Sequence, residues 1–349
     1  MSFRIKVSGA AEAAVETHVP QLVADLVASS ITAQDPALWG KAAEAESAIR
    51  LGWTESVSIS RPLVPEIEAL RDELRAKGVN HIVLGGMGGS SLGPEVIAQT
   101  FSKKLFVLDS TDPNYVAHAL KFELAKSVVV VSSKSGSTIE TASQRALFEG
   151  AFRDAGLNPV DHMVFVTDPG SPLDKQVREG GYAVVNADPN VGGRFSALSA
   201  FGLVSAALIG VDISLLLDDA EKLSSSISVK DSPAIAIAAC LYSLTDQIIN
   251  FCDKGSVTPG LSNWIEQLIA ESTGKDLTGR LPVVIEDIEN AISGITIGFS
   301  PGEYDLVIEA TLGEQFILWE WVTALLCYLL KVDPFNQPNV TEAKDRTSA

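Results

Sequence analysis

A hydroxyl-rich turn between a strand and a helix is the first place where this sequence suggests chemistry. Residues 127–142 read SVVVVSSKSGSTIETA, an apolar run typical of a buried strand followed by a polar turn and a helical segment. Unpaired N–H groups at a helix start favour anions, and hydroxyls and a lysine add donors. A helix cap accounts for one hydroxyl, but residues 132–138 hold five. The turn therefore predicts an anion site. It lacks the GxxxxGK[ST] pattern of a P-loop, so we expect a small phosphorylated metabolite.

A second turn of this kind, GGMGGSSLGPE (85–95), follows the preceding buried strand and starts a helix. Gly86 and Gly88 are followed by Ser91 where a dinucleotide fingerprint has its third glycine, which disfavours a nicotinamide dehydrogenase. A small ligand that approaches the backbone, with the Ser90 hydroxyl beside it, fits better. Both turns would then face one crevice at the carboxyl edge of a parallel sheet.

Three further stretches carry residues that could act on such a ligand. VGGRFS places Arg194 after two glycines, where it is either a cation for phosphate or a developing oxyanion, or an ordinary surface arginine. In NWIEQLIAESTGK, Gln267 and Glu271 are four residues apart and share a helix face. Glu271 is either a general base or, as spacing alone favours, a surface residue near a helix end. FNQPNVTEAKDR holds Gln337 and Lys344 and by itself indicates a solvated final helix.

Length and composition restrict the class of protein. The chain has 349 residues, of which 46% are hydrophobic, enough for two domains or one pseudo-duplicated unit. A net charge of −18 argues against nucleic-acid binding. The three cysteines form no CxxC pair, and the histidines have no metal-ligand spacing. Without a signal peptide or a long apolar run, we expect a cytoplasmic protein with no membrane span.

The alternation of elements predicts an α/β fold with parallel sheets covered by helices on both faces. We expect two three-layer αβα units, with domains at 1–76 (a helical lead-in), 77–205 and 206–349. The strands of the first unit are expected at 80–84, 104–109, 127–132, 162–167 and 182–186. A long helix is expected at 192–211, and the second unit is expected to have helices near 217–228, 232–251 and 313–331 and strands at 292–298 and 305–310.

Together, these motifs resemble those of the phosphoglucose isomerase (glucose-6-phosphate isomerase) family, which is built from two sugar-isomerase (SIS) units. GGMGGSSLGP resembles the family's GxGGSxLGP, SSKSGSTIET its SKTxxTxET, and GGRFS its GGRxS. ESTGK resembles its ExxGK, and FNQPNVTEAK its FDQ-to-Lys segment. The resemblance runs from about residue 80 to residue 344. RLGW, ESTGKDLTGRLP and PFNQPNV are most similar to the isomerase half of bifunctional transaldolase/phosphoglucose isomerase fusions.

The resemblance implies an aldose–ketose isomerase that interconverts glucose 6-phosphate and fructose 6-phosphate through an enediolate. Glu271 would move the proton, Arg194 would stabilise the enediolate, and Lys344 would act near the ring oxygen or the phosphate. The residues implied in substrate and phosphate binding are Gly89, Ser90, Ser133, Lys134, Ser135, Thr138, Gly193, Gln267 and Gln337. The reaction is internally redox-neutral, so neither a nicotinamide cofactor nor a metal is expected. The family also implies a homodimer and a possible functional link to transaldolase.

Two departures from the family pattern bear on activity. The family's ring-opening histidine lies between the glutamate and the lysine, but this chain has no histidine after His162, and Glu314 and Gln315 stand in that region. Loss of one acid–base group costs about 10²- to 10⁴-fold in rate. The alternative function is therefore a catalytically weak or silent sugar-phosphate-binding protein. The chain also ends soon after Lys344, which suggests a trimmed or compact form.

Overall fold

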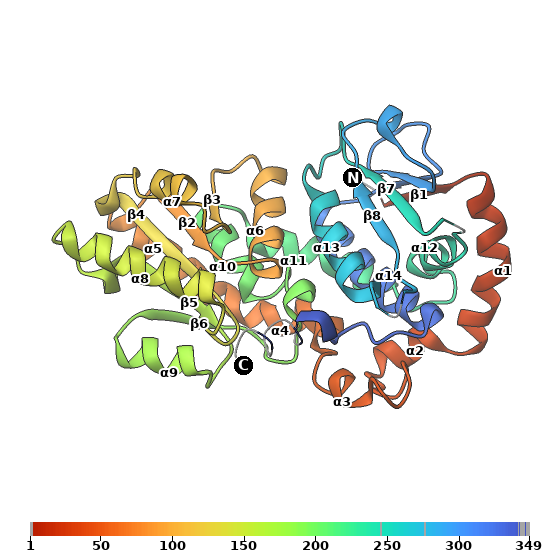
Figure 1. Cartoon of the computed structure of the whole chain (residues 1–349), viewed down its shortest axis with the longest axis horizontal. Coiled ribbons are helices and arrows are strands. Elements are labelled where there is room, and N and C mark those ends of the chain that lie inside the picture. The colour runs from red at the N-terminus through yellow and green to blue at the C-terminus, as the bar shows by residue number, and fades with distance from the viewer. Residues whose placement is uncertain (1–2, 245, 276, 341, 343–345, 347–349) are drawn as a thin grey trace. The chain divides into compact units, whose positions relative to one another are not determined.

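The computed structural model describes residues 3–244, 246–275, 277–340, 342 and 346. Internal contacts divide the chain into two compact units (Figure 1). We call residues 55–219 the central unit, and residues 1–54 with 220–349 the terminal unit. These units differ from the three domains predicted from the sequence, whose boundaries were placed after residues 76 and 205. The predicted boundaries stay a prediction.

The central unit is built on a five-stranded sheet in which every strand is parallel to its neighbours. Its strands, in the order β3-β2-β4-β5-β6, are β2 (His81–Gly85), β3 (Phe106–Leu108), β4 (Ser127–Ser132), β5 (Met163–Thr167) and β6 (Ala183–Asn186). All five strands predicted from sequence are present. The strand order reverses between β2 and β4, so the turns that follow these strands leave the sheet at a topological switch point, where ligands bind in open α/β sheets.

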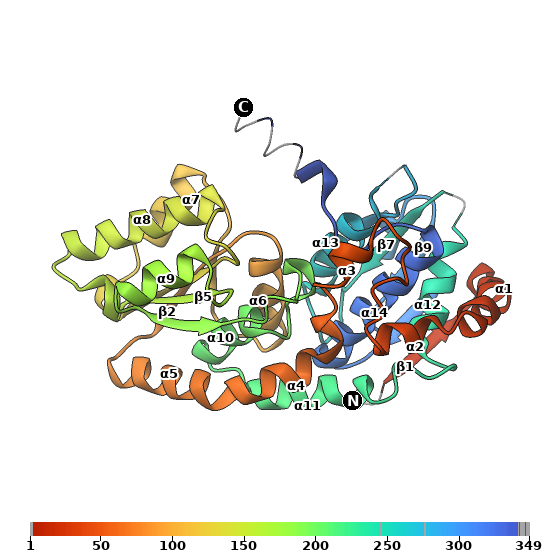
Figure 2. The same cartoon turned by 90° about the horizontal axis from the view of Figure 1, so that it is seen from below.

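Helices cover both faces of this sheet, as Figure 2 shows. On one side lie α7 (Pro113–Ala119), α8 (Ile139–Asp154) and α9 (Pro172–Glu179), and on the other α5 (Val64–Ala76) and α10 (Ala200–Leu208). Helix α6 (Gly89–Thr100) packs against α10, and the short α4 (Ser56–Ser60) precedes α5. Phe148 and Phe152 of α8 are buried against Val129, Val131 and Phe165 of the sheet. This core fixes the start of α8 relative to the end of β4.

The terminal unit holds a second five-stranded sheet in the order β1-β10-β9-β7-β8. Its strands are β1 (Arg4–Val7), β7 (Ile248–Cys252), β8 (Leu281–Val284), β9 (Ile295–Gly298) and β10 (Leu306–Glu309). Four strands are parallel, but β1 pairs antiparallel with β10, Ile5 opposite Ile308. The prediction of parallel sheets therefore needs a correction at this edge, where an antiparallel strand is common in otherwise parallel sheets.

The helices of the terminal unit come from both ends of the chain. They are α1 (Ala10–Ala24), α2 (Val27–Thr32), α3 (Glu44–Ser47), α12 (Pro233–Tyr242), α13 (Leu261–Thr273) and α14 (Leu312–Leu330), with α11 (Ile213–Ser224) crossing the boundary between the units. Helix α14 is almost wholly buried, and its Trp319 ring lies 5.3 Å from Phe251 of β7. Within the residues described, no helix combines the length and apolar character needed to cross a membrane.

The predicted bounds of two helices are wrong in part. The apolar stretch 232–251 forms α12 only as far as Tyr242, and its end belongs to strand β7. The stretch 192–211 begins with a short 3₁₀ turn, Gly193–Phe195, and α10 starts only at Ala200. Ser199 caps α10, because its hydroxyl accepts a hydrogen bond from the Phe201 N–H at 3.2 Å.

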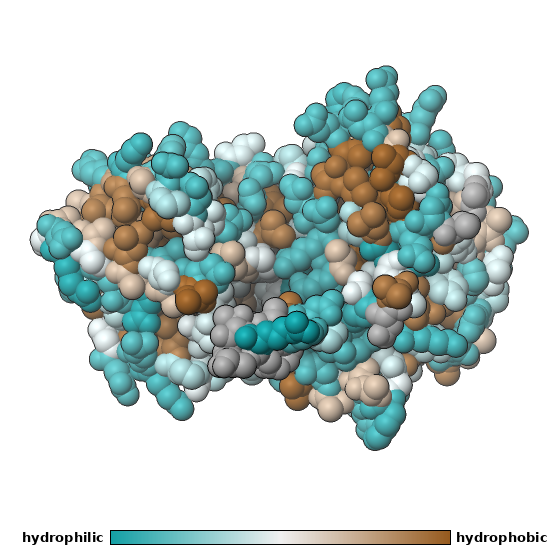
Figure 3. All heavy atoms as spheres, viewed as in Figure 1, coloured by the Kyte–Doolittle hydropathy of each residue, from teal (hydrophilic) through white to brown (hydrophobic). Residues whose placement is uncertain are grey.

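The surface of the terminal unit carries several exposed apolar side chains. Leu277 is fully exposed, and Leu281 and Ile292 are each more than half exposed. Leu281 lies on β8, which forms an edge of the sheet. Figure 3 shows apolar side chains gathered on the visible face of this unit. Exposed edge strands with apolar side chains often contact another chain.

Candidate functional site

The turn after β4 has the geometry of an anion site. Helix α8 begins at Ile139, and its N-cap residue Thr138 makes no side-chain hydrogen bond to the first turn. The positive end of a helix of 16 residues is thus not capped by a side chain. Ser135 and Ser137 are exposed beside this helix start, and Thr138 is half-buried. The turn can therefore present hydroxyls and helix N–H groups to one anion.

Hydrogen bonds within the turn hold its backbone in shape. The Ser133 hydroxyl accepts from the Gly136 N–H at 3.1 Å, and the Ser135 hydroxyl accepts from the Ser137 N–H at 3.2 Å. Gly136 has a positive φ of 77°, and a Cβ there would lie 2.7 Å from the Leu173 side chain. A cavity of about 470 Å³ lies on one side of the turn, lined in part by Ser133, Ser135 and Arg145.

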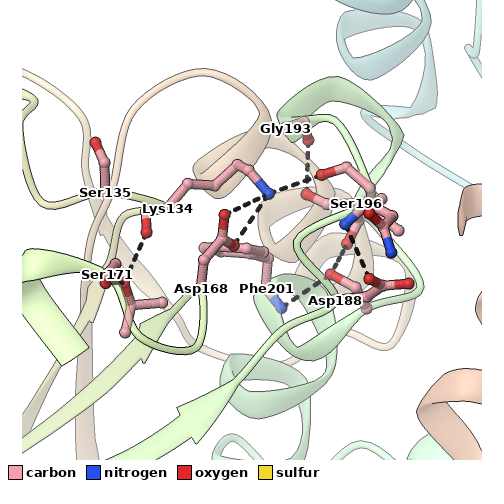
Figure 4. A network of polar contacts seen from close by, with 12 residues as sticks. Lys134, Ser135, Asp168, Ser171, Asp188, Gly193, Ser196 and Phe201 are labelled. Atoms are coloured by element: carbon pink, nitrogen blue, oxygen red, sulfur yellow. Dashed lines mark hydrogen bonds and ion pairs between the residues drawn. The ribbon is translucent and has the colours of Figure 1, made fainter. Parts of the chain in front are cut away.

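The Lys134 ammonium is directed away from the hydroxyls of the turn. Its Nζ lies 3.0 Å from the Asp168 carboxylate and donates to the Val191 carbonyl at 2.8 Å (Figure 4). The same ammonium is 5.9 Å from the centre of the Phe201 ring. Lys134 therefore ties the anion-binding turn to the segment that precedes Arg194. Phosphate contact by this side chain stays a prediction.

The glycine-rich turn after β2 touches the Arg194 segment directly. Helix α6 begins at Gly89, where an added Cβ would lie only 2.3 Å from the Gly193 carbonyl oxygen and 2.8 Å from the Arg194 nitrogen. Ser90, the next residue, is half-buried at the same helix start. Only a glycine allows this backbone approach, which explains the residue type at position 89.

Arg194 is a buried cation on a short turn. It is the middle residue of the 3₁₀ turn Gly193–Phe195 and is only 3% exposed. Gly193 O accepts from the Ser196 hydroxyl at 2.6 Å, which fixes the turn from its other side. Such a charge in a low-dielectric setting acts strongly on any anion or oxyanion near it. The structure thus brings Gly89, Gly193, Arg194 and Lys134 together within the central unit.

In the terminal unit, Gln267 and Glu271 form the predicted pair on α13. Gln267 Nε2 donates to Glu271 Oε2 at 3.2 Å, and both residues are half-buried. Burial raises the pKa of the neighbouring Glu266, on the same helix. The helix ends at Gly274, directly after the motif serine and threonine. Glu271 therefore has a fixed side-chain geometry on a rigid element, as a general base requires.

A second motif lysine anchors the segment that leads to Gln337. Lys275 follows α13 and is 9% exposed, and its ammonium donates to the Asp333 carbonyl. The Asp333 carboxylate in turn accepts from the Phe335 N–H at 2.8 Å. Gln337 is half-buried at the end of this segment, and Lys344 lies outside the described residues.

Neither residue at the position of the missing histidine is disposed as an acid or base. Glu314 Oε2 accepts from the Thr311 N–H at 2.8 Å and from the Thr311 hydroxyl at 2.9 Å, closing a capping box at the start of α14. Gln315 is fully buried, donates to the Ile308 carbonyl at 3.2 Å and accepts from the Trp319 indole at 3.1 Å. Both side chains stabilise the helix start.

Sequence reasoning missed Asp168 and Thr167. Thr167 ends β5, and its hydroxyl donates to the Lys134 carbonyl at 2.8 Å. The Asp168 N–H donates to the same carbonyl at 3.1 Å. Polar residues at the carboxyl end of the strand beside β4 were the available signal, because parallel strands end at one edge of the sheet.

Comparison with known proteins agrees with the motifs. The family model described as phosphoglucose isomerase matches residues 71–284. A glucose-6-phosphate isomerase of Cyanothece is 34% identical over 345 aligned positions, covering 77% of this chain and 65% of that protein. A probable glucose-6-phosphate isomerase of Haloarcula marismortui is 32% identical and covers 58% of this chain and 48% of that protein. The chain spans between 35% and 65% of the length of these and similar curated relatives.

Solved structures confirm the fold. A hypothetical protein of Thermus thermophilus aligns over 99% of both chains with a TM-score of 0.84 and 22% identity. A glucose-6-phosphate isomerase of Chlamydia trachomatis aligns over 82% of this chain and 72% of its own, with a TM-score of 0.71 and 20% identity. The α/β fold predicted from sequence is thereby confirmed, whereas the likeness to transaldolase fusions stays a prediction. Because the family model covers more than half of its residues, the chain belongs to the phosphoglucose isomerase family.

Proposed function

We propose that the chain interconverts glucose 6-phosphate and fructose 6-phosphate by proton transfer through an enediolate. The observation that carries the proposal is the Gln267–Glu271 pair, a half-buried carboxylate held at 3.2 Å by an amide on a rigid helix. A general base of this kind moves a proton between C1 and C2 of an open-chain sugar. The family membership supports the choice of substrate.

The turn after β4 would hold the substrate's phosphate. Its first-turn N–H groups and side-chain hydroxyls match the charge and the hydrogen-bonding capacity of a phosphate group. We assign this role to Ser133, Ser135 and Thr138, with Lys134 taking part through its main chain. Gly89 and Ser90 would line the sugar.

The remaining assigned residues would act on the reacting carbons. The proton next to a carbonyl is weakly acidic, so the base needs an enediolate that is lowered in energy by a fixed cation. Arg194, presented by the Gly193 turn, would supply that cation. Gln267 and Gln337 would contact the sugar.

Ring opening would be the slow step for cyclic substrate. Glu314 and Gln315 are occupied by structural hydrogen bonds, so we assign protonation of the ring oxygen to Lys344. A lysine at its ordinary pKa is a weaker acid at neutral pH than an imidazolium. The chain should then prefer the open-chain fraction of its substrate.

The test is conversion of fructose 6-phosphate to glucose 6-phosphate in a coupled assay, with Glu271→Gln as the base-less variant and Glu266→Gln as the matched control on the same helix. We expect turnover by the wild type and the control and a loss of about 10²- to 10⁴-fold in Glu271→Gln. Solvent deuterium should appear at C2 of the product. A wild type that binds fructose 6-phosphate and converts none of it would exclude the isomerase.

A catalytically silent sugar-phosphate-binding protein is the second candidate. The observation in its favour is that Gln315 is fully buried and bonded to Ile308 and Trp319, while the Glu314 carboxylate is bonded to Thr311, so neither side chain is placed to take over the role of the histidine. Saturable binding of sugar phosphates, with neither turnover nor deuterium exchange at C2, would support this candidate over the first.

We also propose a cytoplasmic homodimer with a functional link to transaldolase. All three cysteines are free and buried, which suits a reducing compartment. The exposed apolar residues Leu277, Leu281 and Ile292 offer surface for a contact between copies. Light scattering that gives the mass of one chain would contradict the dimer. Co-purification with transaldolase activity would test the link.

A further inference from the structure

A polar contact, drawn in Figure 4, joins three loops of the central unit. Lys134 Nζ lies 3.0 Å from both carboxylate oxygens of Asp168 and 2.8 Å from the Val191 carbonyl. The side chains of Lys134 and Asp168 are 25% and 19% exposed, so water screens the pair only in part. One ammonium therefore joins the turn after β4, the end of β5 and the segment before Arg194.

Asp168 is itself firmly held. Its N–H donates to the Lys134 carbonyl at 3.1 Å, so backbone and side chain of these two residues are bonded in parallel. The Thr167 hydroxyl contacts the same carbonyl at 2.8 Å and the Ser171 hydroxyl at 3.0 Å. An aspartate whose backbone is fixed in this way can set the direction of the lysine side chain.

The Val191 carbonyl is three residues before the buried Arg194. The segment between them is a tight turn, in which the Phe195 N–H donates to the Gly192 carbonyl at 3.0 Å. On its other side the turn meets Gly89 without room for a side chain. A shift of Val191 would be passed to Arg194, because close-packed segments move as units.

We propose that Asp168 is a positioning residue: it holds the Lys134 ammonium against the Val191 carbonyl and so fixes Arg194 relative to the anion-binding turn. The role of Asp168 in turnover rests on the proposed function. Its role in holding Lys134 against the Val191 carbonyl does not. It follows that the Lys134 charge serves the loop contact and not the phosphate, and that removal of Asp168 should impair chemistry without weakening anion binding.

The experiment compares Asp168→Asn with wild type and with Asp161→Asn, a control in the same unit whose side chain is 53% exposed. Three quantities are measured: kcat and KM for fructose 6-phosphate, the Kd for inorganic phosphate by calorimetry, and amide hydrogen exchange across residues 191–196. For Asp168→Asn we expect kcat to fall about 100-fold, as a displacement near 1 Å does. KM and the phosphate Kd should be unchanged or lower, and exchange at Phe195 and Ser196 should be faster.

Other outcomes would overturn the proposal. If phosphate binding weakens in Asp168→Asn, Lys134 is oriented as a direct phosphate ligand. If exchange over 191–196 is unchanged, Asp168 does not hold the loop. Exchange and phosphate binding need no turnover, so an inactive wild type would remove the proposed function and leave this test intact. If Asp168→Asn does not fold, Lys134→Met serves in its place, and the same faster exchange with unchanged phosphate Kd is expected.

Discussion

The two units use a motif lysine in the same way, but each holds one acidic side chain in a different environment. In the central unit Lys134 donates to the Val191 carbonyl, and in the terminal unit Lys275 donates to the Asp333 carbonyl. Each lysine holds the segment that carries the next motif residue. Lys134 has the Asp168 carboxylate beside it, whereas in the terminal unit the fully buried Glu320 has two carboxylate oxygens with no hydrogen-bond partner among the described residues.

Glu320 lies on the side of α14 that packs against the helix of the predicted base. Phe316 is 4.8 Å from Trp264 of α13, and the Cys327 thiol is 3.5 Å from the Ser272 carbonyl. Helical spacing places Glu320 near the line between Phe316 and Cys327. By this spacing Glu320 belongs to the side of α14 that carries these two contacts with α13.

The difference suggests that the central unit provides fixed charges and the terminal unit provides acid–base groups. Charges that stabilise an anion act best when they are held in place before it binds. Burial without a hydrogen-bond partner raises the pKa of a carboxyl group, as it does at Glu320. Four substitutions test this difference between the units.

Arg194→Met should have the largest effect, because it removes the fixed cation of the central unit. We expect kcat to fall about 10²- to 10³-fold, the usual cost of one group that stabilises a developing oxyanion. Deuterium exchange at C2 should fall in parallel, since the enediolate itself is affected. Arg178→Met, half-exposed in the same unit and bonded to Asp174, is the control. Equal deuterium exchange in wild type and Arg194→Met would place the electrostatic role elsewhere.

Gly89→Ala should come next. Its Cβ would lie 2.3 Å from the Gly193 carbonyl oxygen, so the turn that carries Arg194 must move. We expect about a 100-fold loss of kcat from this displacement. Gly150→Ala in α8, where a Cβ meets nothing within 4 Å, is the matched control and should stabilise the protein by about 0.5–1 kcal/mol. Full activity in Gly89→Ala would show that the two turns are not coupled.

Much of the central unit was accessible from sequence, because its strands are short valine-rich runs between turns. The terminal unit was harder to predict, since ACLYSLTDQIINF contains an apolar run that fits either helix or strand, and only the polar break SLTDQ separates α12 from β7. The Gln267–Glu271 contact followed from helical spacing. Lys134 and Asp168 are 34 residues apart, and only the order of β4 and β5 in the sheet brings them together.

Lys275→Met tests the lysine of the terminal unit. A buried hydrogen bond from a charged donor contributes about 2 kcal/mol, so the free energy of unfolding should fall by that amount. The segment from Asp333 to Gln337 should exchange its amide hydrogens faster, and KM should rise more than kcat falls. Lys254→Met, whose side chain is 63% exposed, is the control. Unchanged exchange at Phe335 would show that Lys275 does not hold this segment.

Glu320→Gln should have the smallest effect on activity, and its consequence is visible in the pH dependence of stability. Burial raises the pKa of Glu320 well above its usual value, so the folded protein keeps a proton that the unfolded chain releases above about pH 4.3. The folded state then binds more protons, and the free energy of unfolding decreases as pH rises from the unfolded pKa toward the folded one.

Glutamine keeps the size of the side chain and removes this titration, so urea unfolding of Glu320→Gln should show a flatter decline between pH 5 and pH 8. The difference in slope from wild type is at most about 1.4 kcal/mol per pH unit. The exposed Glu12→Gln should keep the wild-type slope. Parallel curves for wild type and Glu320→Gln would mean that Glu320 is ionised in the folded protein, with a partner that stabilises its charge. The contrast between paired charges in one unit and an unpaired acid in the other would then be wrong.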